Sequence, residues 1–479
     1  MKTTTSSPKN ELIYLRIANN IEHKINNEVI KLGDKLPSIR EMCREHGVSM
    51  SSALQAYYVL EGKGLIESRP QSGYYVCYSR KKFPSVPETT QPVNTTEAPD
   101  TETIINKVYS EIGTKHNINF SIGVPSSALL PVAKLNKALT HAIRTLDGGT
   151  DYGLIQGNEK LRRQIARGSF TWDGKLDEHD IVSTAGCMNA LSFCLLSLVK
   201  KGDTIAVESP VYFGILQLAK NLGLNVMELP TNCCTGVEIE ALKKALHTKK
   251  IKLCLLISNF NNPLGSCMPD EHKKEVVKLM EKYNVPLIED DLYGDVYFGS
   301  HRPKCCKTYD ESGIVLWCGS VSKTLAPGYR VGWVAPGKFK DQIIKTKRYH
   351  SVSASEITQE AIGDFLENGR YENHLRKLRH TLQCNSMQYM RAICEYFPFD
   401  TKVSHPTGGF IQWVELNKKI NTIKLYELAV QQKVSFAPGR MFTLQKQYDN
   451  CMRISYGLEW NEKVENALKT LGRLAKSML

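Results

Sequence analysis

A proline-rich segment near the N-terminus divides this chain into two parts that fold separately. Residues 83–101, FPSVPETTQPVNTTEAPDT, contain four prolines among threonine and serine, with few large apolar side chains. Such a segment cannot bury a hydrophobic face, and its prolines favour an extended, semi-rigid tether. We therefore predict a small module at residues 1–78, a linker at 79–114 and a large module at 115–479.

Composition and the lengths of apolar runs limit the class of protein and its expected location in the cell. Hydrophobic residues make up 42% and charged residues 23% of the 479 positions, a globular balance that excludes disorder as the dominant state. No apolar run reaches the roughly 18 residues that span a bilayer, and residues 1–20 lack the apolar core of a signal peptide. We expect a cytoplasmic protein with no membrane association. The 14 cysteines form no cluster with histidine at zinc-binding spacing, so we expect reduced thiols and no metal site.

The small module begins with a helix that has one apolar face. Leu12, Leu15, Ala18, Ile21 and Ile25 recur at helical spacing and predict one buried stripe. Residues 1–82 carry 13 basic and 8 acidic side chains, and this excess of positive charge favours a polyanionic partner.

Cap and turn signals place the other elements of this module. Ser38 and Glu41 form an S-x-x-E capping box that opens a second helix, Gly47 ends it, and Ser49 can cap a third. Residues 64–78 alternate apolar side chains around a Pro-Gln-Ser-Gly turn, which is typical of a two-stranded wing. Two short helices around a glycine turn indicate a helix-turn-helix, although a small protein-interaction domain with a hairpin would show the same elements.

The string from Leu36 to Val76 closely resembles the winged helix-turn-helix of the GntR family of bacterial transcription regulators. The resemblance implies binding to operator DNA, with the third helix in the major groove and the turn Gln71–Ser72–Gly73 in the minor groove. Met50 and Leu54 stand where many relatives carry arginine, so Gln55 and the nearby serines must read the bases, or Met50 contacts a thymine methyl group. The DNA-binding residues implied are Arg40, Ser49, Ser51, Ser52, Gln55, Arg69 and Gly73.

Short apolar runs alternate with helical patterns from about residue 115 onward. The runs DIVSTAG, DTIAVESP, KLCLLIS, VPLIEDD and GIVLWCGS are separated by helical segments. This order predicts an α/β fold with a mainly parallel sheet that helices cover on both faces. Polar motifs directly follow several of these runs, at the edge where such sheets bind ligands.

Three of these motifs indicate specific chemistry. Gly186 opens a helix whose first N–H groups can hold a phosphate. Lys323 lies between two serines and Arg330, and a lysine in a polar, partly buried site can form a Schiff base with an aldehyde. Asp290 follows an apolar strand, where a carboxylate can keep a pyridinium nitrogen protonated. Taken singly, each motif also fits an exposed loop, a solvated charge pair or a capped helix.

Together, the order and spacing of these polar motifs resemble the fold-type I, class I/II aminotransferase domain, which binds pyridoxal 5′-phosphate (PLP). The resemblance covers roughly residues 115–479 and implies a large α/β PLP-dependent transferase fold with a small C-terminal α+β subdomain. Lys323 would form the internal aldimine, Asp290 would pair with the pyridine nitrogen, and Arg453 would grip the carboxylate of a substrate. The remaining cofactor contacts implied are Gly186, Cys187, Met188, Tyr212, Asn262, Tyr293, Ser320, Ser322 and Arg330, with Tyr152 reaching the phosphate from the partner subunit.

Two further expectations concern residues near these motifs. Asp291, beside the predicted pyridine partner, is expected to be structural or solvated rather than a second catalytic acid. Gly408 and Gly409 are expected where the backbone approaches a ligand.

A GntR-type winged helix joined to an aminotransferase-like domain is the architecture of the MocR family of bacterial regulators, which this chain resembles over its whole length. The resemblance implies a homodimer that binds operator DNA and senses PLP, an amine or an amino acid through aldimine formation. It also implies a location in the cytoplasm, on the nucleoid when DNA is bound. The alternative is an active PLP-dependent aminotransferase with an accessory DNA-binding domain, because the cofactor site looks complete.

Overall fold

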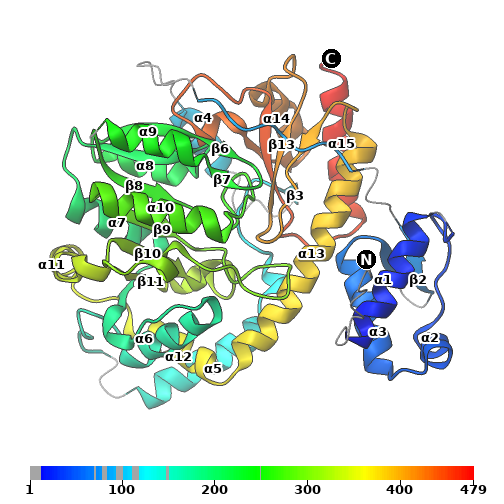
Figure 1. Cartoon of the computed structure of the whole chain (residues 1–479), viewed down its shortest axis with the longest axis horizontal. Helices are drawn as coiled ribbons and strands as arrows, with labels where there is room; N and C mark the ends of the chain where they lie inside the picture. Colours follow the sequence, from blue (N-terminus) through cyan, green and yellow to red (C-terminus); the bar gives the residue numbers. More distant parts are fainter. Residues whose placement is uncertain are drawn as a thin grey trace, which may run out of the picture.

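The computed structural model describes residues 12–27, 29–69, 72–77, 83–92, 101–110, 118–146, 150–248 and 250–479. A small module of three helices and a hairpin stands beside a much larger α/β body (Figure 1). Helix α13 (Arg370–Tyr396) runs along the side of the body that faces the small module. The chain is therefore a multidomain protein with a small α+β unit and a large α/β unit, as the sequence patterns predict.

The small module is a winged helix-turn-helix. Helix α1 (Ile13–Asn26) packs against α3 (Met50–Gly62), and α2 (Ile39–His46) precedes the turn into α3. Strands β1 (Ile66–Arg69) and β2 (Gly73–Val76) pair in antiparallel register as the wing. The helix-turn-helix and the wing predicted from cap and turn signals are both present.

Hydrogen bonds explain where α2 and α3 begin and end. Ser38 N donates to Glu41 Oε2 at 2.6 Å and Glu41 N donates to Ser38 Oγ at 3.2 Å, which confirms the predicted capping box. Gly47 ends α2 with φ at +62°, a conformation that a residue without a Cβ atom adopts without strain. Ser49 caps α3 by accepting a hydrogen bond from Ser52 N at 3.2 Å.

The predicted apolar stripe of the first helix is partly wrong. Leu12 is 57% exposed, and Leu15 is only half-buried. The helix begins at Ile13, so Leu12 precedes its first turn and is not held on its inner face. The buried residues of α1 are Ile17, Ala18, Ile21 and Ile25.

The large body is built on an eight-stranded sheet. Its strands follow the order β4, β11, β10, β9, β8, β5, β6, β7, and the central strands from β10 to β6 pair in parallel. Strands β11 and β7 run antiparallel to their neighbours. The bounds are β4 (Val182–Thr184), β5 (Thr204–Ser209), β6 (Asn225–Asn232), β7 (Gly236–Val237), β8 (Ile251–Leu256), β9 (Leu287–Asp290), β10 (Val315–Ser320) and β11 (Gly332–Ala335).

Helices cover both faces of this sheet because successive side chains of a strand point to opposite faces. Ile205 and Val207 of β5 belong to the core that contains α7, α8 and α11, whereas Ala206 between them belongs to the core with α9 and α10. The bounds of these helices are α7 (Cys187–Leu198), α8 (Phe213–Asn221), α9 (Ile239–His247), α10 (Asp270–Tyr283) and α11 (Lys340–His350). Three further helices pack together beside the sheet: α5 (Val132–Thr145), α6 (Glu159–Gly168) and α12 (Glu356–Glu367).

The C-terminal part forms the expected small α+β subdomain. Four strands pair in the antiparallel order β12, β13, β16, β15, and α13 shares their core with α14 and α15. A short parallel pair, β3 with β14, ties residues 118–119 to this subdomain. The bounds are β3 (Ile118–Asn119), β12 (Lys402–Val403), β13 (Ile411–Glu415), α14 (Thr422–Gln431), β14 (Val434–Ser435), β15 (Ala437–Pro438), β16 (Cys451–Ser455) and α15 (Glu462–Lys476).

The described parts of the predicted linker lie against the large body, a contact that the expectation of an extended, semi-rigid tether did not include. Val403 N donates a hydrogen bond to Ser85 O at 2.9 Å, because the extended, proline-rich backbone of residues 83–92 runs beside a strand. Helix α4 (Glu102–Ser110) follows and buries three apolar side chains at helical spacing, Ile104, Ile105 and Val108.

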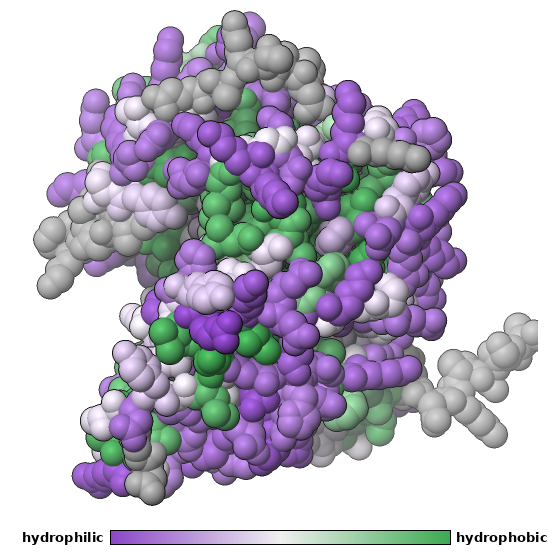
Figure 2. All heavy atoms as spheres, turned by 90° about the vertical axis from the view of Figure 1, so that its left-hand side faces the viewer, coloured by the Kyte–Doolittle hydropathy of each residue, from purple (hydrophilic) through white to green (hydrophobic). Residues whose placement is uncertain are grey.

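Apolar side chains are unevenly distributed over the surface. Figure 2 shows an apolar area framed by polar side chains on the face that lies to the left in Figure 1. Large hydrophobic side chains that are exposed in the large body include Tyr152, Leu154, Tyr349 and Val352. Within the described ranges, no helix combines the length and the apolar character needed to cross a bilayer.

Removing the cap of α2 should loosen that helix. In Ser38→Ala we expect the α2 amides to exchange hydrogen about fivefold faster, because losing an N-cap costs about 1 kcal/mol. Hydrogen exchange followed by mass spectrometry over residues 39–46 measures this. Glu41→Gln is the matched control, since glutamine still accepts from Ser38 N, and should change exchange less than about twofold. Equal exchange in Ser38→Ala and wild type would contradict a stabilising capping box.

Candidate functional site

The carboxyl ends of neighbouring strands bring the polar motifs to one edge of the large sheet. β9 ends at Asp290, which pairs in register with Cys318 of β10. β10 ends at Ser320 and continues into a turn that carries Lys323, while β4 is followed by Gly186 at the start of α7. Because these strands run in the same direction, residues far apart in the sequence meet at this edge.

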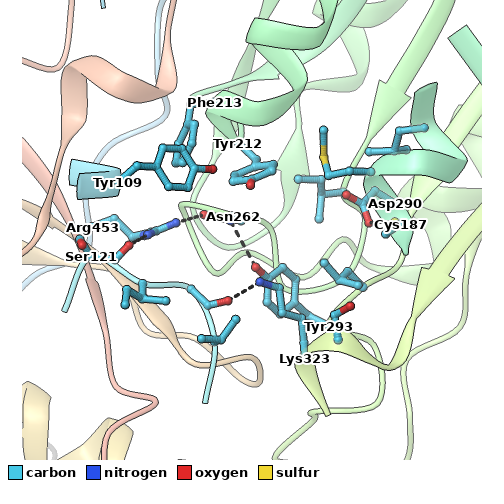
Figure 3. Close-up of a pocket in the computed structure, with 18 of the residues that line it drawn as sticks. Tyr109, Ser121, Cys187, Tyr212, Phe213, Asn262, Asp290, Tyr293, Lys323 and Arg453 are labelled. Atoms are coloured by element: carbon cyan, nitrogen blue, oxygen red, sulfur yellow. Dashed lines mark hydrogen bonds between the residues drawn. The ribbon is translucent and has the colours of Figure 1, made fainter. Parts of the chain in front are cut away.

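These motifs surround a cavity of about 260 Å³ (Figure 3). Three predicted contacts do not line it: Gly186, Ser320 and Tyr152, the last of which is 85% exposed. The predicted cofactor and substrate contacts that line the cavity are Cys187, Met188, Tyr212, Asn262, Asp290, Tyr293, Ser322, Lys323, Arg330 and Arg453.

Lys323 points its amine into the cavity (Figure 3). Its Nζ donates a hydrogen bond to Gly123 O, on the loop that follows β3. Burial and then the charge of Arg453 lower the pKa of Lys323 to about 8, although the Asp290 carboxylate acts in the opposite direction. A substantial part of this amine is therefore neutral near physiological pH, and a neutral amine is the nucleophilic form.

The two adjacent carboxylates at the end of β9 have different environments. Asp290 faces the cavity, and burial raises its pKa to about 6 despite a lowering hydrogen bond from the Cys187 thiol at 3.3 Å. Asp291 is buried on the other side. Burial there acts to raise its pKa, but an ion pair with Arg302 and hydrogen bonds from Asn259 and Trp317 hold it below its usual range. Asp291 is thus structural, as predicted, and not solvated.

The start of α7 and the turn around Lys323 form a cradle for an anion. Gly186 precedes α7 with φ at +91°, and a Cβ atom at this position would collide with the guanidinium of Arg330. Arg330 Nη2 donates to Ala185 O at 3.1 Å, which holds its charge beside the first turn of α7. Ser320 Oγ and Ser322 Oγ lie 2.7 Å apart and share a hydrogen bond. Helix N–H groups, hydroxyls and a guanidinium are together suited to a phosphate.

A chain of hydrogen bonds crosses the cavity from Arg453 to Tyr293 (Figure 3). Arg453 Nη1 donates to Asn262 Oδ1 at 3.0 Å, and Asn262 Nδ2 donates to Tyr293 Oη at 3.2 Å. Arg453 Nη2 donates to Ser121 O. Arg453 is 2% exposed, and its Nε has no hydrogen-bond partner among the described residues. A buried donor of this kind can donate a hydrogen bond to a carboxylate oxygen of a ligand.

Several cavity residues were not predicted from the sequence. Tyr109 and Val108 come from α4, inside the segment assigned to the linker, and Ser121 and Gly123 come from the loop after β3. Phe213 lines the cavity beside Tyr212, with ring centroids 4.8 Å apart. The helical spacing of apolar residues in α4 could have predicted that helix from the sequence. Gly123 contributes its backbone carbonyl group, which every residue type carries, so no sequence signal marks it.

The structure corrects the expectation for Gly408 and Gly409. Neither residue lines the cavity. A Cβ atom on Gly408 would collide with the ring of Phe260 and the carbonyl oxygen of Val296, so this glycine permits close packing inside the protein.

The residues expected to contact DNA lie on one module. Arg40, Ser49, Ser51 and Gln55 are exposed, and Ser52 is half-buried. Ser49 Oγ lies 2.9 Å from the hydroxyl oxygens of Ser51 and Ser52, so these serines form one hydrogen-bonded group at the start of α3. Gly73 begins β2 at φ +105°. Gln71 and the side chain of Arg69 lie outside the described residues.

Two known protein families match separate parts of the chain. Residues 13–76 match the family described as bacterial regulatory proteins, gntR family, and residues 115–471 match aminotransferase class I and II. The fold of the large body is similar to that of the multiple substrate aminotransferase from Thermococcus profundus, with 24% identity, a TM-score of 0.73, and coverage of 79% of this chain and 96% of that chain. At this identity the likeness establishes the fold alone.

Two Escherichia coli proteins match along nearly their whole length. The uncharacterized HTH-type transcriptional regulator YjiR is 36% identical over 96% of this chain and 98% of its own. The uncharacterized HTH-type transcriptional regulator YdcR is 34% identical over 97% of this chain and 99% of its own. With a GntR-type winged helix-turn-helix and a class I and II aminotransferase domain in this shared order, the chain belongs to the MocR family of transcription regulators.

Proposed function

We propose that this regulator binds operator DNA through its winged helix, holds PLP in the cavity around Lys323, and changes its affinity for DNA when an amine or amino acid enters that cavity. The observation that carries the proposal is the course of α13, which contacts both the turn beside Lys323 and the DNA-binding module. We place the protein in the cytoplasm, and on the nucleoid when DNA is bound.

The groups around the cavity fit PLP. Asp290 lines the cavity and is not ion-paired with any described side chain, so it is available to a ring nitrogen that carries a proton. The cradle formed by Gly186, Ser322 and Arg330 offers donors for a phosphate. PLP, when bound, supplies an aldehyde that condenses with amines and a ring that withdraws electrons.

The chain's own side chains would bind and orient the ligands. Lys323 provides an amine that loses its proton near pH 8. Tyr293 and Asn262, already hydrogen-bonded to each other, would bind the phenolic oxygen of the ring, and Tyr212 would cover its face. The unpaired Nε of Arg453 would bind the carboxylate of an amino acid.

Helix α13 joins the cavity to the DNA-binding module. Near its start, Tyr371 Oη is hydrogen-bonded to Thr324 Oγ1 at 2.9 Å, and His374 Nε2 lies 2.7 Å from Thr324 O. Thr324 directly follows the cavity lysine. Near the other end of α13, Arg391 Nη1 donates to Glu67 of the wing at 3.1 Å. A helix of 27 residues is about 40 Å long, so a displacement of the turn at Thr324 can be carried to the winged helix.

We also propose a homodimer. Tyr152 is too exposed to contact the cavity of its own chain, which supports a role at the phosphate of a partner subunit. Exposed Leu154, Tyr349 and Val352 add apolar surface that a partner would cover.

Transamination is the second function that the cavity supports, because Asp290, Lys323 and Arg453 line it together. The relation to transcription regulators along the whole chain favours regulation. Turnover of amino-acid and keto-acid pairs, without any effect of ligands on DNA binding, would favour the enzyme.

Lys323 should carry PLP covalently. We expect wild-type protein incubated with PLP to turn yellow, and borohydride to trap the cofactor on Lys323, which peptide mass spectrometry identifies. Because burial lowers the pKa of Lys323 to about 8, the rate of uptake should rise as the pH passes through about 8 rather than near 10. Lys323→Ala should lose the trapped cofactor, and exposed Lys345→Ala should keep it. A wild-type protein that takes up no PLP would overturn this part of the proposal.

Two exposed side chains of the winged helix should affect DNA binding differently. Arg40→Ala removes a phosphate contact, so binding should weaken for all sequences and the dependence of log affinity on log salt should fall by about one. Gln55→Ala should change the preference among operator variants, each base mismatch being worth about 1–3 kcal/mol. Fluorescence anisotropy at several salt concentrations measures both effects, with Arg473→Ala on α15 as control. Unchanged binding in both variants would place the recognition surface elsewhere.

Breaking the hydrogen bond between α13 and the cavity turn should uncouple the two sites. In wild type we expect PLP or an added amine to change operator affinity about 5- to 150-fold, which corresponds to about 1–3 kcal/mol. Tyr371→Phe should reduce this factor while PLP uptake and the operator affinity of the apo protein stay unchanged. Tyr283→Phe, at the C-terminal end of α10 and outside the cavity, is the matched control. Identical operator affinity in apo, PLP-bound and amine-treated wild type would refute the sensor.

A further inference from the structure

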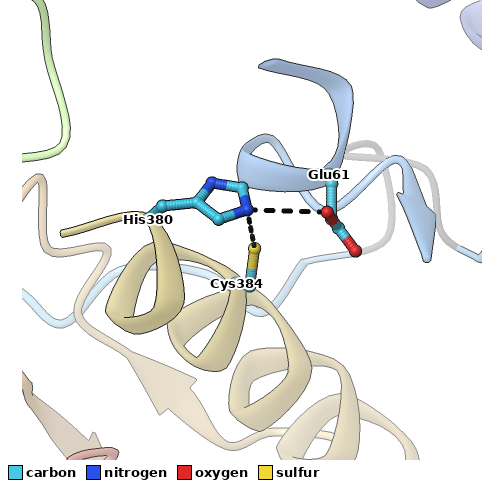
Figure 4. Close-up of side chains that lie close together, drawn as sticks. All are labelled: Glu61, His380 and Cys384. Atoms are coloured by element: carbon cyan, nitrogen blue, oxygen red, sulfur yellow. Dashed lines mark hydrogen bonds and ion pairs between the residues drawn. The ribbon is translucent and has the colours of Figure 1, made fainter. Parts of the chain in front are cut away.

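Three side chains with metal-binding atoms meet where the winged helix touches α13 (Figure 4). Glu61 lies near the end of α3, and His380 and Cys384 lie one turn apart on α13. His380 Nε2 is 3.6 Å from Glu61 Oε2 and 3.8 Å from Cys384 Sγ. One such atom from each residue lies within 4.8 Å of the other two. None of the three residues lines the cavity around Lys323.

The separations from His380 Nε2 to the other two side chains suit a single tetrahedral ion. Zinc binds histidine nitrogen and carboxylate oxygen at about 2.0–2.2 Å and thiolate sulfur at about 2.3 Å, which puts neighbouring ligand atoms about 3.4–3.6 Å apart. The distances from His380 Nε2 to Glu61 Oε2 and to Cys384 Sγ exceed this by a few tenths of an ångström at most. His380 and Cys384 form only a pair in the sequence, which does not indicate a zinc cluster by itself. They lie at positions i and i+4 of α13 and point the same way, as two ligands do in helical zinc sites.

Neighbouring groups hold the three side chains in place. Ser68 N donates to Glu61 Oε1 at 3.2 Å, which leaves the other carboxylate oxygen turned toward His380. The Tyr58 ring packs against the His380 ring with centroids 4.7 Å apart. Such contacts orient metal ligands in known sites. The side chains of His380 and Glu61 are 33% and 18% exposed, so an ion can reach them from solvent.

An ion pair between Glu61 and His380 would explain why these two side chains lie close together. It would not explain why the Cys384 thiol lies beside them. A nitrogen, a sulfur and an oxygen ligand together favour zinc over magnesium or calcium, which prefer oxygen ligands alone.

We propose that Glu61, His380 and Cys384 bind one zinc-class transition-metal ion, with a fourth position open to water or another ligand. The ion fastens the C-terminal end of α3, the expected recognition helix, to α13. It thereby adds a second input, independent of PLP and of an amine ligand, to the contact between the DNA-binding module and the large body. Binding of the ion does not depend on the function proposed above.

Metal binding is tested on the reduced full-length protein after treatment with a chelator. We expect titration with Co²⁺ to produce thiolate-to-metal absorbance with one equivalent per chain, and competition with a colorimetric chelator to give the Zn²⁺ affinity. Cys384→Ser should remove the absorbance, and Cys384→Ser and His380→Ala should each weaken Zn²⁺ binding about tenfold or more. Cys394→Ser, on the same helix, is the matched control and should change neither. Equal Zn²⁺ affinity in wild type and the Cys384→Ser/His380→Ala double variant would overturn the site.

A separate measurement tests whether the ion connects α3 to α13. His380 and Cys384 both lie on α13, so their variants do not test the contribution of Glu61 on α3. Glu61→Gln should weaken Zn²⁺ binding several-fold, and an unchanged affinity would overturn the claim that the ion joins α3 to α13. Alkylation of the wild-type protein tests the site without any variant, so the result does not depend on whether a variant folds. Zn²⁺ should slow alkylation of Cys384 by iodoacetamide, as followed by peptide mass spectrometry, without slowing alkylation of Cys394. Equal protection of both cysteines, or of neither, would contradict the site.

Discussion

The parallel register of β8, β9 and β10 is the constraint on which the cavity depends. Three successive carboxylates at the end of β9 show this. Glu289 points into the protein and accepts hydrogen bonds from the backbone of Cys306 and Lys307, and burial raises its pKa. Asp290 faces the cavity, and Asp291 is paired with Arg302. Because side chains alternate along a strand, a slip of one residue in register would exchange these roles.

The second structural theme is that one long helix, α13, contacts both the turn beside the cavity and the DNA-binding module. The first turns of α13 contact the backbone and side chain of Thr324, beside the cavity lysine. Near its middle His380 pairs with Glu61, and near its C-terminal end Arg391 pairs with Glu67 of the wing. These contacts form a continuous path of packed and hydrogen-bonded groups, and coupling through such a path requires only that ligands favour one arrangement of it over another.

Much of the fold and the cavity could be predicted from the sequence, for identifiable reasons. The capping box of Ser38 and Glu41 and the left-handed Gly47 are local features, so their spacing suffices. Asp290 ends one apolar strand and Lys323 comes shortly after another, and the carboxyl ends of such strands lie at the ligand-binding edge of a parallel sheet. The errors concern packing between distant segments. Leu12 has helical spacing but precedes the helix, and the proline-rich segment is extended as expected yet lies along the large body.

The sequence by itself therefore determined the two folding units, their elements and the residue types at the ends of the strands, because propensity, periodicity and capping act over a few residues. Only the tertiary structure decided which groups meet. Gly123 accepts a hydrogen bond from Lys323 with its carbonyl group, and Glu61 approaches His380 and Cys384 from more than 300 positions away. Such contacts carry no local sequence signal, because they arise from the packing of whole elements whose relative placement depends on the entire core.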